Sequence, residues 1–132
     1  MLIILALALF KFALQAQTDE TPFTFVEKMP EFVGGNKKMN RFISDNIHFP
    51  DECRNEGPGY VVIVQFVVDT SGYISNPKVV RGARCGCNQE AMRIMNLMNE
   101  NNPHWIPGMH NGRKVRVQYT LPIKFERNMT KD

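Results

Sequence analysis

The strongest constraint on the fold is the stretch from Val115 to Phe125, in which apolar and polar side chains alternate. The apolar positions are Val115, Val117, Tyr119, Leu121, Ile123 and Phe125, and the residues between them are Arg116, Gln118, Thr120, Pro122 and Lys124. Successive side chains of a strand point to opposite faces, so this pattern predicts a β-strand with one buried and one exposed face. Other elements of the chain must then cover the buried face.

Pro122 lies inside this alternating stretch. Proline has no N–H to donate to a ladder, and within sheets it is confined mainly to edges, strand starts and bulges. We therefore expect the last strand to be an edge strand, whose unpaired N–H and C=O groups another chain can extend by strand addition. The alternative is that Pro122, together with Arg116 and Lys124, only protects a free edge against pairing.

Two earlier stretches predict a hairpin. The residues from Tyr60 to Val68 are mostly β-branched or aromatic and end at a turn-forming segment, Asp69 to Gly72. Tyr73 to Val80 is expected to form the returning strand. Pro77 within it is expected at a bulge or at an unpaired position, because it cannot donate a ladder hydrogen bond.

Two segments have apolar side chains at helical spacing. The first runs from Asn36 to Ile47 and the second from Asn88 to Met98, and each asparagine is available as an N-cap. The apolar faces consist of Met39, Phe42, Ile43 and Ile47 in the first helix, and of Ala91, Ile94, Met95 and Met98 in the second. The predicted fold class is α+β, with two layers: a three-stranded antiparallel sheet and two helices packed on one face.

Between the second helix and the last strand, Pro103 to Gly108 is expected to form an irregular aromatic turn, and Asn111-Gly112 a tight turn. Trp105 is interpreted as a core residue that fixes the loop rather than as a peptide-stacking aromatic. The methionines of the second helix, Met92, Met95 and Met98, are interpreted as core filling rather than as a binding surface.

The amino-terminal residues predict export. Residues 1–16 are apolar apart from Lys11 and Gln15, and Ala16 is a small residue before a polar segment. This stretch is shorter than the roughly 20 residues of a spanning helix and is typical of a signal peptide cleaved after Ala16. The alternatives are an uncleaved short anchor or a start codon misplaced downstream of the true one. We expect a flexible start over 17–24, one domain over 25–126 and a tail over 127–132.

Composition and spacing argue against several function classes. The net charge is +3, and lysines and arginines are scattered among carboxylates, so we expect no nucleic-acid partner. Cys85 and Cys87 with His104 and His110 do not have the spacing of a compact zinc site. No base stands near a cysteine in the sequence to activate it as a nucleophile. We expect no enzyme activity, no metal and no cofactor.

Three cysteines allow one internal disulfide and leave one thiol over. Cys53 can pair with Cys85 or with Cys87. A direct bridge between Cys85 and Cys87 would close a very tight loop and is disfavoured by geometry.

Several segments, in order and with their spacing, resemble the TonB C-terminal domain family, in the form common in Bacteroidetes. They are Val26 to Gly35, Asn46 to Pro50, Val64 to Gly72, Val79 to Gly82, Glu90 with Ala91, Trp105 to Gly108, Asn111 to Val117, and Leu121 to Phe125. The resemblance covers roughly Phe25 to Phe125.

This resemblance implies a periplasmic domain of an energy-transducing transport system that binds a short extended box at the N-terminus of an outer-membrane receptor. It implies a second partner, the inner-membrane energising complex. Carried over residue by residue, backbone pairing would come from Val115, Arg116, Val117, Gln118, Tyr119, Thr120 and Leu121. The segment that also approaches the box would consist of Asn46, Ile47, His48, Phe49 and Pro50.

The sequence departs from a full transducer, because neither a long hydrophobic anchor nor a proline-rich spacer stands between Met1 and the expected domain. Force transmission is therefore left open. The second hypothesis is a self-associating structural or assembly protein of the cell envelope, which uses the same edge to form a homodimer without energy transduction.

Overall fold

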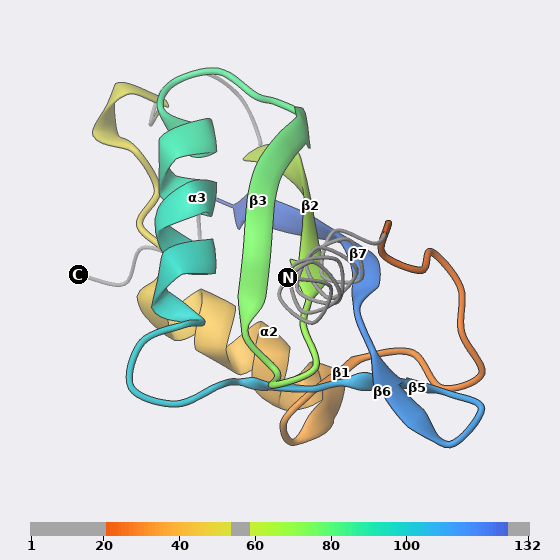
Figure 1. Ribbon diagram of the computed structural model, residues 1–132. Coiled ribbons are helices and arrows are strands. Elements are labelled where there is room, and N and C mark those ends of the chain that lie inside the picture. The colour runs from red at the N-terminus through yellow and green to blue at the C-terminus, as the bar shows by residue number, and fades with distance from the viewer. Residues whose placement is uncertain (1–20, 54–58, 127–132) are drawn as a thin grey trace, which may run out of the picture.

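A three-stranded antiparallel sheet, with strand order β3-β2-β7, forms one layer of the protein (Figure 1). The structure is a computed structural model and describes residues 21–53 and 59–126. The strands are β2 (Gly59–Val68), β3 (Ile74–Arg81) and β7 (Val117–Glu126). The predicted hairpin is thus confirmed, and so is the expectation that the last strand lies at an edge of the sheet.

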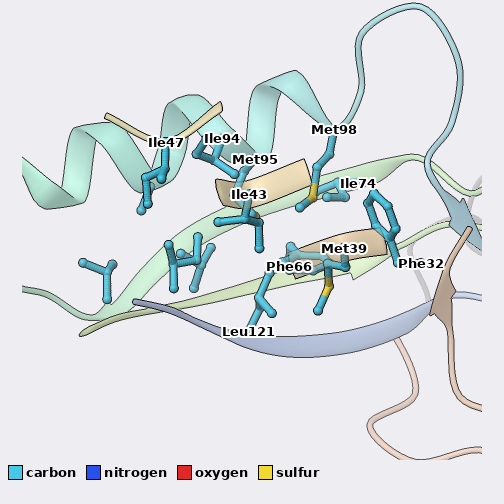
Figure 2. Close-up of a cluster of buried hydrophobic side chains, with 14 of the residues drawn as sticks. Phe32, Met39, Ile43, Ile47, Phe66, Ile74, Ile94, Met95, Met98 and Leu121 are labelled. Atoms are coloured by element: carbon cyan, nitrogen blue, oxygen red, sulfur yellow. The ribbon is translucent and has the colours of Figure 1, made fainter. Parts of the chain in front are cut away.

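Two helices, α2 (Gly35–Asn46) and α3 (Cys87–Leu97), form the second layer, and a short 3-10 helix, η1 (Asp51–Cys53), follows α2. Side chains from both helices and the sheet meet in one core between the layers (Figure 2). The helix residues predicted to face the core are buried, apart from the partly buried Phe42, which packs against the core. The two-layer α+β fold class is therefore confirmed.

Both predicted N-caps are wrong. Helix α2 begins after Gly34, which has a φ of 90°, and α3 begins after Gly86, which has a φ of 77°. Left-handed glycines therefore stand at the N-cap of each helix, two residues before the predicted asparagine caps. Asn36 then lies within the first turn of α2, and the side-chain oxygen of Asn88 accepts a hydrogen bond from the N–H of Ala83 at 2.9 Å instead of capping α3.

The β2–β3 hairpin has the predicted turn and bulge. One carboxylate oxygen of Asp69 accepts hydrogen bonds from the N–H groups of Ser71 and Tyr73, as expected for turn chemistry. At Gly72, which has a φ of +86°, an added Cβ would lie 2.2 Å from the carbonyl oxygen of Trp105. The register shifts between Gln65 and Val67, opposite the stretch that contains Pro77. Pro77 therefore lies at a bulge.

Two pairs of short strands accompany the main sheet, and one of these strands, β4, lies in the segment expected to be an irregular turn. The pair β1 (Glu31–Phe32) and β4 (Trp105–Ile106) is antiparallel, as is the pair β5 (Gly108–His110) and β6 (Arg113–Val115). Positive φ angles of 50° at Asn111 and 72° at Gly112 form the predicted turn between β5 and β6. Trp105 is 3% exposed and its ring lies against Phe32, Phe66 and Tyr119, so it is a core residue as predicted.

The prediction of one strand from Val115 to Phe125 is wrong at its beginning. Val115 ends β6, where it pairs with Gly108, and β7 starts at Val117. The chain changes partners at Arg116, because β6 belongs to a hairpin with β5 whereas β7 pairs with β2. Alternation in the sequence continues through this change and therefore does not reveal it.

The predicted signal peptide over 1–16 and the tail over 127–132 lie outside the described residues. Of the expected flexible start, residues 21–24 are described, and Phe23 within them is hydrogen-bonded to the rest of the domain. Over the two described stretches, no helix is both long and apolar enough to cross a membrane.

Candidate functional site

The outer edge of β7 is the site that the sequence predicted. Strand β7 pairs with β2 without a register shift, from Glu126 opposite Gly59 to Val117 opposite Val68. Its side chains alternate as expected: Val117, Leu121, Ile123 and Phe125 are buried, and Thr120, Pro122 and Lys124 are exposed. Because residues of an antiparallel ladder alternate in the side to which their N–H and C=O groups point, every second residue of β7 directs these groups away from β2.

The hydrogen bonds of Phe23 show which residues of β7 direct their N–H and C=O groups away from β2. Its N–H donates to the carbonyl oxygen of Arg116 at 3.0 Å, and its carbonyl accepts a hydrogen bond from the N–H of Gln118 at 2.7 Å. The outward groups farther along the strand are therefore the N–H and C=O of Thr120 and Lys124 and the C=O of Pro122. Within residues 21–53 and 59–126, no hydrogen bond reaches these groups. As far as the described residues go, this part of the edge is open, and it is named the open edge below.

Pro122 stands at an outward position, opposite Ile63 of β2. An N–H at this position would point away from β2, so proline costs the sheet no ladder hydrogen bond there. The same residue removes one donor from the open edge. A strand that pairs with β7 finds donors at Thr120 and Lys124 and only an acceptor between them.

A groove of about 410 Å³ runs beside the open edge, between β7 and helix α2. Its lining comes from Asn36, Met39, Asn40 and Ile43 of α2 and from Tyr119 to Lys124 of β7. Met39, Ile43, Leu121 and Ile123 are buried and form an apolar floor, and Asn36, Asn40, Thr120 and Lys124 are exposed at the rim. Lys124 is the one charged residue among the lining residues. Every second side chain of a strand added to β7 would enter this groove.

The α2 residues of the groove were not predicted as site residues. Met39 and Ile43 were identified only as core residues, from their helical spacing. Asn36 and Asn40 lie one turn apart on the side of the helix next to them. The sequence contains no signal for which strand α2 lies over, and that placement alone creates the groove.

The segment Asn46 to Pro50 does not line this groove. It is bound to α3 instead: the N–H of His48 donates to the carboxylate of Glu90 at 2.8 Å, and the guanidinium of Arg93 donates to the carbonyl of Asn46. Within this segment, Ile47 and Phe49 are buried. The structure therefore separates the two groups of site residues predicted from the family.

Glu90 and Arg93 form the ion pair that holds this segment. Arg93 donates from Nε to one carboxylate oxygen of Glu90 at 3.0 Å and from Nη2 to the other at 2.5 Å. Burial disfavours the charged form of Glu90, but hydrogen bonds from Arg93 and from the N–H of His48 outweigh it and hold the pKa of Glu90 below its ordinary value. This carboxylate is thus ionised at neutral pH and fixes the start of the segment between α2 and β2.

The remaining predicted residues of the edge differ in their availability. Val115 belongs to β6, and the outward carbonyl of Arg116 and the outward N–H of Gln118 are already bonded to Phe23. Tyr119, Thr120 and Leu121 line the groove, and the lining continues beyond the predicted range to Pro122, Ile123 and Lys124.

The cysteines and histidines lie in different parts of the described structure. Cys85 and Cys87 flank the start of α3, and burial raises the pKa of the Cys87 thiol. The side chain of Cys53 is outside the described atoms, so its pairing with Cys85 or Cys87 stays a prediction. His104 packs against Phe32 and Phe42, and His110 lies in β5 beside Phe23. Among the described residues, no three potential ligand side chains come together as a metal site.

Fold and edge together define a small α+β domain with an outer strand exposed beside a groove. The chain belongs to the family described as Gram-negative bacterial TonB protein C-terminal, whose model matches residues 45–126. A comparison with curated proteins gave no match. The family is a non-enzymatic protein-interaction domain whose members interact with outer-membrane proteins. Membership supports a TonB-like periplasmic domain in energy-coupled transport.

Proposed function

We propose that this domain recognises the N-terminal box of outer-membrane receptors by β-strand addition to the outer edge of β7. The observation that carries the proposal is the open row of backbone groups from Thr120 to Lys124 beside the groove under α2. An extended peptide satisfies these groups with its own backbone and places alternate side chains in the groove.

The groove supports this function better than it supports a small-molecule site. It is an open trough along one strand, and its walls are a strand edge and one helix. Its apolar floor favours aliphatic side chains, and its rim amides at Asn36 and Asn40 can hydrogen-bond with peptide groups. Within this proposal, the peptide lies along Tyr119 to Lys124, and the segment Asn46 to Pro50 contacts only the part of the receptor that extends beyond the groove.

The domain is proposed to act outside the cytoplasm after removal of residues 1–16, and to couple receptor binding to the inner-membrane energising complex. The second candidate function is self-association of two copies through the same edge of β7. The observation that favours it is the same open row of donors and acceptors, which a second copy of β7 can also pair with. The two functions differ in which strand fills the edge.

The substitution Thr120→Pro tests the proposal. It removes one outward N–H, and because that group does not bond to β2, the domain is expected to stay folded. The affinity for the N-terminal peptide of a receptor, measured by titration calorimetry, should fall at least about tenfold, which corresponds to about 1.4 kcal/mol.

The matched control is Thr120→Ala, which removes the side chain and keeps the N–H. Its affinity should stay within about twofold of the wild type, a change of under about 0.5 kcal/mol. Equal affinities for the proline and alanine variants would contradict strand addition at Thr120. Sedimentation velocity on the same samples separates the second function, because concentration-dependent dimers that the peptide does not dissociate would favour self-association.

A further inference from the structure

The outer edge of the chain from Arg116 to Lys124, to which the partner is proposed to bind, is here named the docking edge. Its start is occupied by the protein's own residue Phe23. Residues 21–28, here named the strap, run past β7 and the β5–β6 hairpin (Figure 1). Two backbone bridges attach the strap, and the N–H of Glu27 also donates to Nδ1 of His110 at 3.4 Å. Phe23 bridges Val117 in parallel orientation, and Lys28 bridges Met109 in antiparallel orientation.

The two attachments differ in burial. At the second, Lys28 and Met109 exchange hydrogen bonds of 3.0 and 2.8 Å, and Val26 beside it is 2% exposed. At the first, Phe23 is 42% exposed, and its ring lies 5.4 Å from the ring of His110. Phe25, between the two, is 81% exposed. The first attachment can therefore open at Thr24 and Phe25 while the second holds the strap to the domain.

Phe23 also lies on β7 directly before the residues of this strand that line the groove. A residue paired as Phe23 is, in parallel and opposite Val117, would be followed at every second position by residues opposite Tyr119, Leu121 and Ile123. The last three of these β7 residues line the groove. The strap leaves the edge after Phe23. One extended peptide could therefore pair first at the position of Phe23 and then, in the same register, along the groove.

We propose that the seat of Phe23 on β7 is a second subsite of the docking edge, held by the strap in the unbound protein and taken by an aromatic residue of a longer partner peptide. This inference rests on the proposed function of the edge. The incoming strand runs in the same direction as the strap, its aromatic ring replaces that of Phe23 beside His110, and its backbone takes over the hydrogen bonds to Arg116 and Gln118.

The strap then acts as a place-holder that distinguishes peptides by length. A peptide that covers only the groove binds without moving Phe23. A longer peptide must displace it, and its apparent affinity is reduced by the fraction of molecules in which the strap is seated. Both Phe23 and most of α2 precede the residues matched by the family model, so this device belongs to the part of the chain outside that match.

The test uses two synthetic peptides and the full domain. The long peptide carries the sequence of residues 21–24 followed by an alternating valine–serine stretch, and the short peptide carries that stretch alone. Affinities are measured by calorimetry for the wild type, for Phe23→Pro, which loses the N–H bonded to Arg116, and for Phe25→Ala as the matched control in the strap. Amide hydrogen exchange at Phe23 and Lys28 is followed by NMR.

The inference predicts that the long peptide binds Phe23→Pro at least about threefold more tightly than it binds the wild type or Phe25→Ala, because the competing strap is released. The short peptide should bind all three equally. In the wild type, the long peptide should speed exchange at Phe23 and leave Lys28 protected. If both peptides protect Thr120 while Phe23 stays protected with the long one, the second subsite is refuted and the docking edge stands. If neither peptide protects Thr120, the docking edge fails and the subsite with it.

Discussion

The ionised side chain of Glu90 stabilises the fold through its hydrogen bonds. Its carboxylate accepts hydrogen bonds from Arg93 and from the N–H of His48, and so ties the loop before β2 to α3. The side chain is 14% exposed, so these bonds are little screened by solvent. The charge on Glu90 therefore contributes to the stability of the loop rather than to binding at the edge.

The substitution Glu90→Gln should lower the free energy of unfolding at pH 7 by about 1 to 2 kcal/mol, as expected for lost hydrogen bonds to a charged group. The folded pKa of Glu90 lies below its unfolded value, which is about 4.3. The stabilisation is thus present above that pH and is lost as the pH falls through the folded pKa.

Urea unfolding of both proteins at a series of pH values measures this difference, which should shrink as the medium becomes acidic. Glu100→Gln, at an exposed carboxylate just after α3, is the control and should be neutral throughout. A difference between wild type and Glu90→Gln that is independent of pH would show that the carboxylate charge does not matter.

Pro122 gives a second prediction at the scale of one residue. Pro122→Ala adds an outward N–H and disturbs no bond to β2, so unfolding by urea should change by less than about 0.5 kcal/mol. The affinity for a receptor peptide should rise about fivefold, because a peptide carbonyl gains a donor worth about 1 kcal/mol.

Ile123→Pro is the contrasting variant, because it removes an N–H that faces β2 and also a buried side chain. It should destabilise the domain by at least about 3 kcal/mol. A clear gain of stability in Pro122→Ala, together with a small effect of Ile123→Pro, would mean that position 122 faces β2 and that the assignment of outward and inward positions is reversed.

At the scale of elements, the groove depends on α2 lying over β7. Asn40→Trp should fill this groove from an exposed position on the helix, and lower the affinity for a receptor peptide at least about tenfold, or about 1.4 kcal/mol. Lys37→Trp, on an exposed part of α2 that does not line the groove, should bind within about twofold of the wild type, under about 0.5 kcal/mol. Fluorescence titration measures both, and equal binding by the two variants would exclude the groove.

The elements themselves were largely predictable. Alternation identified β7, and Pro122 identified it as an edge, because the pattern and the missing donor both follow from strand geometry. The helix starts were predicted wrongly because Asn36 and Asn88 are favourable N-cap residues in the sequence. The structure instead places left-handed glycines, Gly34 and Gly86, at the N-caps. The division at Arg116 could not be predicted, since Val115 keeps the alternation while it pairs with Gly108.

The site was predictable only in part, for a reason that belongs to tertiary structure. The backbone edge follows from one strand, whereas the groove requires α2 and β7, which are separated by most of the chain, to lie side by side. The occupation of Arg116 and Gln118 by Phe23 likewise depends on the path of the strap. Sequence patterns report which face of an element is buried and do not report what lies next to its edge.

In the whole molecule, the helices cover one face of a single sheet and form the core with it. Strand β7 lies at the edge of this sheet, where another strand can pair with it. The family match over 45–126 includes all three strands of this sheet and α3. The strap and most of α2 precede the match. Helix α2 supplies one wall of the groove, and the strap supplies the contact at Val117. The proposed docking edge thus lies within the family match, whereas the groove residues of α2 and the strap lie before it.

Amide hydrogen exchange along β7, with and without a saturating receptor N-terminal peptide, tests the docking edge most directly. We predict rapid exchange at Thr120 and Lys124 in the unbound domain and at least about tenfold slower exchange in the complex, equivalent to about 1.4 kcal/mol of protection. Tyr119, Leu121 and Ile123, which bond to β2, should be protected in both states. A bound peptide that leaves Thr120 and Lys124 exchanging as before would contradict the claim that β7 receives it.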